Sequence, residues 1–243
     1  MTKFPRSLAH VLAALLLCAC GTPPGKPVKN SEVPAPNEIL DFAALFGANC
    51  AGCHGENGRG GAGPPLSDPV YLAITDVKTV QKTITQGVPG TPMAPFGQSA
   101  GGMLTDKQVE VIASGIFSRW SKPGILSGVD VPAYASSSAG DAKRGAEDYK
   151  TFCETCHGSD GRGGPKGSSI IERAYLALTS NQGLRTAVIV GRPDFGAPDW
   201  RNNVPGHPMT EQQITDVVAW LAEQRPANAA QQNQVAKEQH NAK

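Results

Sequence analysis

The chain has 243 residues, and its 22 Lys and Arg nearly balance its 21 Asp and Glu. This balance argues against a nucleic-acid partner, because proteins that bind nucleic acid usually carry a basic patch or stripe. The length allows one large domain or two small ones. With 28 glycines, 20 prolines and only 6% aromatic residues, the chain has little apolar material for a core. We therefore expect a buried cofactor to fill the middle of the fold.

Residues 1–19 are predicted to form a bacterial lipoprotein signal peptide. A positively charged start precedes an apolar run at residues 11–17, which is too short to span a membrane. The run leads into Ala19-Cys20, which resembles the lipobox of bacterial lipoproteins. The resemblance implies cleavage after Ala19 and a lipid on Cys20. The alternative is an ordinary secretory signal with incidental cysteines.

The lipobox resemblance also predicts where the protein is located. Gly21 follows the cysteine, where bacterial lipoproteins retained at the inner membrane often have Asp, so the outer membrane is mildly favoured. We expect an exported protein that faces the periplasm and is held by its N-terminal lipid, with no other segment able to span a bilayer. Residues 20–37 are Pro-rich and are predicted to be an extended tether.

An internal repeat follows the tether, and its first copy is placed at residues 38–122. Before the first pair of cysteines, apolar side chains recur at helical spacing: Ile39, Phe42, Leu45 and Phe46. A Gly-rich loop comes next, then a short helix around residues 77–86 and a Pro-containing loop. Thr105 and Gln108 form a capping-box pattern, which predicts the start of a closing helix.

A linker rich in Pro, Gly and Ser, residues 123–138, leads to the second copy at residues 139–227. The same order of elements is expected there, with a short helix around residues 183–190. Its markers are Ala146, Tyr149 and Phe152 before the cysteines, and Thr210 with Gln213 at the closing helix. Residues 228–243 form a polar tail that is predicted to be disordered. No strand-like alternation stands out, so the predicted fold is all-α with two tandem domains.

Each copy contains the motif Cys-x-x-Cys-His, the attachment signature of c-type haem. The residues are Cys50, Cys53 and His54 in the first copy, and Cys153, Cys156 and His157 in the second. Two thiols one helical turn apart can form thioethers with both vinyl groups of one porphyrin. The adjacent His then supplies a ring nitrogen to the iron. The predicted cofactors are two covalent haem c groups, one enclosed by each domain.

Thiol pairs with this spacing have other uses. Thioredoxin-type redox pairs lie in a βαβ pattern, which is lacking around these cysteines. The four cysteines could form one Cys₄ zinc site or disulfides, but both alternatives leave His54 and His157 unexplained. Haem attachment is therefore the favoured interpretation, and export fits it, because bacteria attach c-type haem outside the cytoplasmic membrane.

The repeated unit resembles the class I cytochrome c domain over nearly all of residues 38–227. The shared order is helix, Cys-x-x-Cys-His, Gly-rich loop, Met-bearing loop and closing helix. The resemblance implies an all-α domain wrapped around haem, with His and Met as axial ligands. In the first copy, Met93 lies in a Pro-containing loop like the family's Met loop, so Met93 is the predicted sixth ligand. Met103 is the alternative, although its place beside the closing helix suggests a packing role.

The second copy departs from the family pattern at this ligand. When Phe96 is aligned with Trp200, Ala197 stands opposite Met93, and alanine cannot bind iron. Either His207 or Met209 could reach the iron, although packing is the favoured role for Met209. The iron could also stay five-coordinate or hold water, or a group such as a lysine could bind. His207 is the candidate residue, with an open iron as a comparable outcome.

Arg59 and Arg162 follow the haem motif at matching positions. An Arg fork suits a carboxylate, so contacts with a haem propionate are predicted, and a solvated loop position is an equal alternative for both. The leading function is an electron carrier that serves redox partner proteins or is a subunit of a respiratory complex. The alternative is a haem enzyme or ligand sensor that uses an open iron in the second domain.

Overall fold

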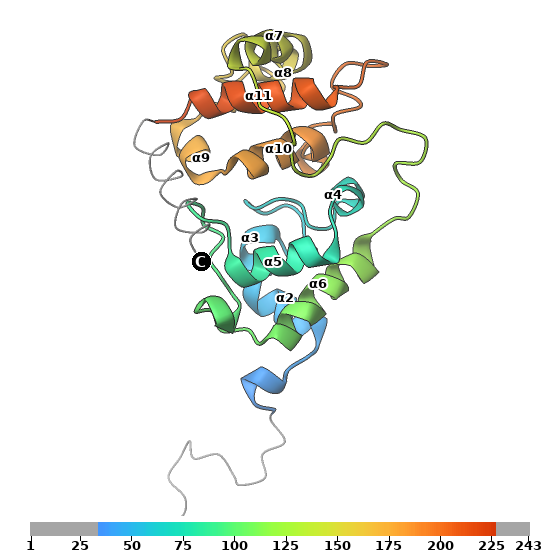
Figure 1. The fold of residues 1–243 in the computed structure, drawn as a ribbon, viewed down its shortest axis with the longest axis vertical. Coiled ribbons are helices and arrows are strands. Elements are labelled where there is room, and N and C mark those ends of the chain that lie inside the picture. Colours follow the sequence, from blue (N-terminus) through green and yellow to red (C-terminus); the bar gives the residue numbers. More distant parts are fainter. Residues whose placement is uncertain (1–33, 227–243) are drawn as a thin grey trace, which may run out of the picture. The chain divides into compact units, whose positions relative to one another are not determined.

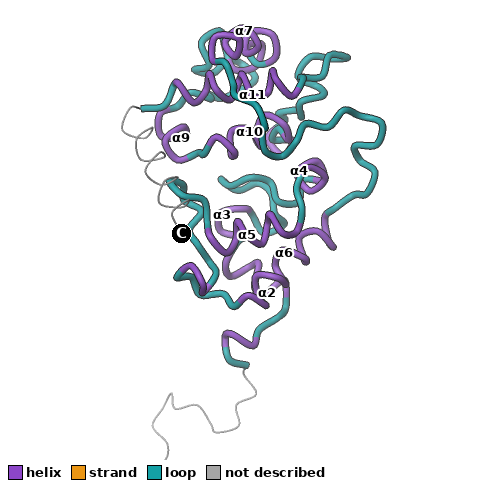
Figure 2. The backbone as a smooth tube through the Cα atoms, in the orientation of Figure 1, coloured by secondary structure: helices purple, strands orange, loops and turns teal. Residues whose placement is uncertain are grey.

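The computed structural model describes residues 34–226. The predicted signal peptide, Cys20, most of the tether and the predicted tail therefore lie outside the described residues. Within the described part, the secondary structure is helical, and the strand-type pairing is limited to isolated bridges (Figure 2). This confirms the predicted all-α fold. No helix in residues 34–226 has the length and apolarity needed to cross a membrane.

The first domain contains five α-helices within the described range (Figure 1). They are α2 (Phe42–Asn49), α3 (Ala51–His54), α4 (Pro69–Ile74), α5 (Val77–Gln86) and α6 (Asp106–Trp120). Two 3-10 turns, η1 (Pro36–Glu38) and η2 (Gln98–Ala100), lie before α2 and α6. The short helix predicted around residues 77–86 has the expected bounds.

The second domain repeats this order (Figure 1). Its helices are α7 (Ala142–Phe152), α8 (Glu154–His157), α9 (Arg173–Leu178), α10 (Asn181–Val190) and α11 (Glu211–Glu223). One 3-10 turn, η3 (Pro193–Phe195), follows α10. The helix predicted at residues 183–190 begins two residues earlier, because the Ser180 hydroxyl caps it by accepting a hydrogen bond from the Gly183 amide.

Side-chain caps explain where most helices begin. Thr105 and Thr210 each form the predicted capping box with Gln108 and Gln213. Asp41 caps α2, so Ile39 lies before the helix. Its spacing had suggested a place on the first turn. Helix α4 was not predicted, although an Asp cap followed by Pro69 at the first helical position is a start signal.

The first and last helices of each domain pack against each other at a point where one of the two helices has a glycine. In the first domain, Gly115 of α6 faces the Phe42 ring of α2, and a Cβ at Gly115 would lie 2.1 Å from Phe42 Cδ2. In the second domain the glycine lies on the other helix: a Cβ at Gly145 of α7 would lie 2.0 Å from the Asp216 carbonyl oxygen of α11 and 2.9 Å from Trp220 Cβ. Counted from the cysteines and the helix caps, the two pairs occupy equivalent positions. Both crossings therefore need one glycine to bring the helices together.

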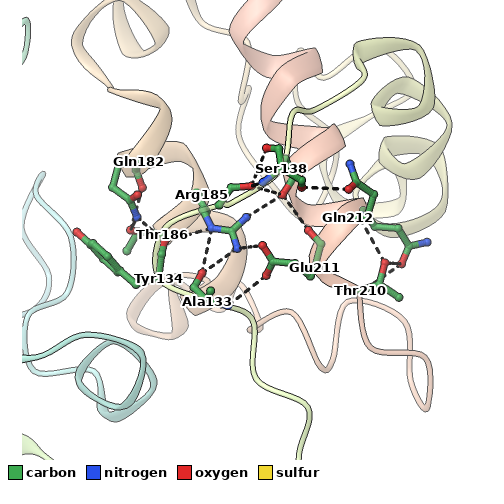
Figure 3. Close-up of polar contacts among 12 residues, drawn as sticks. Ala133, Tyr134, Ser138, Gln182, Arg185, Thr186, Thr210, Glu211 and Gln212 are labelled. Atoms are coloured by element: carbon green, nitrogen blue, oxygen red, sulfur yellow. Dashed lines mark hydrogen bonds and ion pairs between the residues drawn. The ribbon is translucent and has the colours of Figure 1, made fainter. Parts of the chain in front are cut away.

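The end of the linker is bound to the second domain (Figure 3). Arg185 of α10 is 3% exposed, and its guanidinium donates to the carbonyl oxygens of Ala133 and Tyr134 at 2.8 and 3.1 Å. The same guanidinium contacts Glu211 and the Thr215 hydroxyl of α11. Residues 133–138, which we call the strap, are thus part of the second domain, and the segment free to act as a linker is shorter than predicted.

Candidate functional site

The two Cys-x-x-Cys-His motifs have nearly the same backbone geometry. Each spans the junction between the first helix of its domain and a single helical turn, α3 or α8. The His54 amide donates to the Cys50 carbonyl at 3.0 Å, and the His157 amide donates to the Cys153 carbonyl at 2.9 Å. This turn puts both thiols and the ring on one short segment, as two thioethers and one axial ligand require.

Each motif histidine is oriented by a backbone carbonyl. His54 Nδ1 lies 2.9 Å from the oxygen of Pro64, and His157 Nδ1 lies 2.7 Å from the oxygen of Ser168. A carbonyl oxygen can only accept, so these contacts require the proton on Nδ1. In a neutral ring with this proton the lone pair is on Nε2, which is the nitrogen available to bind iron.

Glycines line the ring of each motif histidine. A Cβ at Gly63 would lie 2.8 Å from Cε1 and Nδ1 of His54, and a Cβ at Gly167 would lie 2.9 Å from the same atoms of His157. No other residue fits there without moving the ring. The sequence pattern predicts a Gly-rich loop here but does not single out these positions. Their similar spacing after each motif was the available signal.

The first cysteine of each motif has the raised pKa of a thiol removed from solvent. All four are free of disulfides. Burial, and secondarily the neighbouring Cys53, raises the pKa of Cys50 to about 11, and burial together with Cys156 raises the pKa of Cys153 to about 12. A thioredoxin-type pair needs the opposite shift. Within residues 34–226 no group of three or more His, Cys, Asp or Glu side chains is arranged to hold a metal ion.

The loops that follow α5 and α10 establish which residues correspond. The Val88 amide donates to the Met93 carbonyl at 2.8 Å, and the Arg192 amide donates to the Ala197 carbonyl at 3.1 Å. Val88 and Arg192 each follow a glycine that ends the helix with positive φ, 66° at Gly87 and 68° at Gly191. Ala197 thus occupies the place of Met93, as the sequence alignment predicted.

The other candidate ligands differ in exposure. Met103 is 78% exposed, whereas Leu104 beside it is buried, so Leu104 fills the packing position that we had suggested for Met103. Met209 is buried, and its amide donates to the Trp200 carbonyl as the Leu104 amide donates to Phe96. These matching bonds give Met209 the predicted packing role.

His207 is exposed and lies near the second motif. Its ring stacks on Phe152, the residue before Cys153, with the ring centroids 5.8 Å apart and the planes 16° from parallel. This contact explains the orientation of the His207 ring without a bond to iron. Ligation of the second iron by His207 stays a prediction. Arg59 and Arg162 are both exposed, and Arg162 pairs with Asp160 at 3.2 Å, so their predicted propionate contacts also stay predictions.

The residues present therefore fit covalent haem in both domains. Each motif offers two thiols on one turn, a histidine with a free Nε2 and a glycine that makes room for the ring. Residues 37–114 match the family model described as cytochrome c oxidase, cbb3-type, subunit III. Residues 142–225 match the family model of cytochrome c. Two cytochrome c-type domains thus stand in tandem, and the chain binds two haem c groups.

Curated relatives are cbb3-type oxidase subunits. The chain is 36% identical over 136 residues to subunit FixP of Azorhizobium caulinodans, covering 52% of this chain and 42% of the relative. It is 31% identical over 130 residues to subunit CcoP of Cereibacter sphaeroides, covering 50% and 40%. The match thus spans less than half the length of either relative. Among solved structures, a chain of the Kuenenia stuttgartiensis reducing HAO-like protein complex matches with a TM-score of 0.41 and 18% identity, covering 80% of this chain and 100% of that one.

Proposed function

We propose, from the premise that this chain is a tandem c-type cytochrome with two haem c groups, that it passes single electrons between redox partners in the periplasm as part of a respiratory complex. The observation that carries this proposal is the duplicated motif geometry, in which His54 and His157 each keep Nε2 free. When bound, each haem supplies a one-electron couple of ferric and ferrous iron. The relatives' names, which are those of oxidase subunits, support the complex as partner.

The residues of the chain set the conditions for this couple. Burial lowers the pKa of His54, against the opposing effect of its bond to Pro64, so that ring stays neutral. A Met93 sulfur on the first iron would favour the ferrous state and raise the potential of the first domain. Ala197 offers no such sulfur, so we expect the second domain to have the lower potential.

The haem count tests the proposal in a host that can attach c-type haem. The wild-type chain should retain two haems after denaturation, and a reduced-minus-oxidised spectrum should show both. The paired variants Cys50→Ala/Cys53→Ala and Cys153→Ala/Cys156→Ala should each retain one. A wild-type chain without covalent porphyrin would refute the proposal, and so would two haems that do not exchange electrons with an external donor.

The location is proposed from the N-terminal sequence alone. Ala19-Cys20 supports an exported lipoprotein tethered by residues 20–37, with the outer membrane favoured. Cys20→Ser should abolish labelling by a fatty-acid probe and release the protein from membranes, whereas Cys18→Ser should leave both unchanged. Equal labelling of the two variants would contradict the assignment of Cys20.

A ligand-binding second haem is the alternative function. Two observations favour it: Ala197 occupies the place of Met93, and the His207 ring is stacked on Phe152. An iron without a strong sixth ligand binds small molecules. Rapid binding of carbon monoxide to the second haem would support this alternative, and slow binding would support ligation by His207 or another side chain.

A further inference from the structure

The loop of the second domain that replaces the Met93 loop contacts the first domain. Asp194 of η3 accepts a hydrogen bond from the Gly60 amide, with 3.0 Å between Oδ2 and the nitrogen. Arg192 Nη2 donates to the Gly61 carbonyl oxygen at 2.9 Å. Backbone groups of two consecutive residues of the first domain are therefore held by two side chains of the second. We call these four residues the clasp.

The two side chains of the clasp are also paired with each other within the second domain. Arg192 Nε and Nη2 contact the two carboxylate oxygens of Asp194 at 3.0 and 2.9 Å, which is the bidentate geometry. The guanidinium also lies over the Phe195 ring, 4.5 Å from its centroid. The Asp194 side chain is only 8% exposed. An ion pair so fixed loses little freedom when it accepts and donates these further bonds.

Both sides of the clasp belong to segments that hold haem. A Cβ at Gly61 would lie 2.2 Å from the Cys53 carbonyl oxygen and 2.8 Å from the Gly55 amide, so Gly61 packs directly on the first motif. On the other side, the Arg192 amide and carbonyl both bond to Ala197, which stands in the place of Met93. The clasp thus joins the attachment segment of one haem to the sixth-ligand loop of the other.

We infer that Arg192 and Asp194 are positioning residues that hold the two haem-binding domains at one separation, so that an electron passes directly between them. The inference rests on the proposed electron-carrier function. In the step it serves, one electron leaves one iron and arrives at the other, and no bond or proton changes place. The rate of electron tunnelling falls steeply with distance, so a fixed contact between the domains gives a single rate of electron transfer. A pair joined only by the linker would sample many rates.

Hydrogen exchange of the holo-protein tests the contact itself. In Asp194→Ala and Arg192→Gln, amides of peptides covering residues 58–66 should exchange roughly tenfold faster, because each change removes a hydrogen bond that involves a charged group. Glu147→Gln is the matched control, since it breaks an exposed ion pair with Lys150 inside α7 and should leave residues 58–66 unchanged. Far-ultraviolet circular dichroism checks that each variant is folded. Unchanged exchange in both clasp variants would overturn the inference.

Electron exchange between the domains tests the consequence. After rapid reduction of one haem, the wild type and Glu147→Gln should equilibrate in a single fast phase that is independent of protein concentration. Asp194→Ala and Arg192→Gln should lose that single phase and show slower, multiple phases, with haem content and potentials unchanged. Faster hydrogen exchange with an unaltered electron phase would overturn the positioning role. A chain that retains no haem would refute the proposed function instead, and the hydrogen-exchange result would still stand.

Discussion

Single residues distinguish the two haem sites of this chain more than the fold does. The motif turns, the carbonyl partners of His54 and His157 and the glycines beside their rings are repeated almost atom for atom. The clearest change lies at the predicted sixth-ligand position, where Ala197 stands in the place of Met93. A repeated scaffold in which one donor atom is changed is expected to give two centres of different potential.

The ligand role of Met93 predicts a spectroscopic result. Met93→Ala should abolish the weak near-infrared sulfur-to-iron band of the oxidised protein and lower the potential of the first haem, because the thioether donor is lost. Met103→Ala is the control, since Met103 is 78% exposed and should leave the band unchanged. A band that survives in Met93→Ala but disappears in Met103→Ala would assign the ligand to Met103.

The glycine at the crossing of α2 and α6 predicts a stability result. In Gly115→Ala the new methyl group would lie 2.1 Å from Phe42 Cδ2, and this overpacking should lower the free energy of unfolding by about 2 kcal/mol. Gly47→Ala is the control on the other helix of the crossing. Nothing lies within 4 Å of its added Cβ, so it should stabilise by roughly 0.5–1 kcal/mol through helix propensity. Denaturant unfolding measures both, and equal effects would contradict the close contact.

At the scale of the helical elements, the two domains differ in how their first and last helices are joined. In the second domain, Asp216 of α11 is 1% exposed, and its carboxylate accepts from the Asp141 amide at 2.7 Å. The carboxylate also accepts from Arg144 and Gln212. In the first domain, Val111 occupies the matching position on α6. The α7–α11 crossing is therefore polar at a point where the α2–α6 crossing has an apolar residue.

This difference predicts that acid destabilises the second domain first. Burial alone would raise the pKa of Asp216, but the hydrogen bonds from Arg144, Asp141 and Gln212 outweigh it and lower the pKa. Because the pKa of Asp216 is lower in the folded state, its ionised form stabilises the fold. This stability is fully present above the unfolded-state pKa near 4 and is lost as the pH falls through the folded-state pKa. Asp141 and Asp148 are the other acids that face this group.

Acid titration of the folded protein measures this effect. The second domain should unfold at a higher pH than the first, and Asp216→Asn should remove much of that difference by destabilising the second domain at neutral pH. Simultaneous acid unfolding of both domains in the wild type, with Asp216→Asn unchanged, would contradict the assignment. The absorbance of each haem reports on its own domain, and the α-helical signal reports on the whole chain.

At the scale of the whole molecule, the strap and the clasp show that the linker does not separate two independent domains. A Pro-, Gly- and Ser-rich segment suggests two domains that move independently. Instead, Arg185 holds residues 133–138 on the second domain, and Arg192 with Asp194 holds the first. The chain from residue 37 to the end of the described part therefore forms one compact unit.

The strap predicts a protease-sensitive variant. Arg185→Leu leaves the carbonyls of Ala133 and Tyr134 and the Glu211 carboxylate without their buried partner, which should cost on the order of 3 kcal/mol and open the strap to limited proteolysis. Lys150→Met removes an exposed ion pair and should cost less than about 1 kcal/mol, with no new cleavage. Identical cleavage patterns would show that the strap is held by other contacts.

The sequence by itself determined the features that depend on neighbouring residues. Cys-x-x-Cys-His needs only one helical turn, and a capping box needs only three residues, so the haem motifs, the closing helices and the all-α class could be predicted. The correspondence between the Met93 loop and the Ala197 loop could also be predicted, because Gly87 and Gly191 mark the same helix end in both copies. Helices α4 and α9 were not predicted, because each is too short to show a periodic pattern of apolar residues.

Tertiary structure alone decided the features that join distant residues. Gly115 and Phe42 are 73 positions apart, and Gly60 and Asp194 are 134 apart, so no local pattern marks either pair. Packing also decided which of two adjacent residues, Met103 or Leu104, enters the core. The physical reason is the same in each case: burial, close packing and charge pairing depend on where the chain folds back, and composition alone does not reveal which partner a side chain will meet.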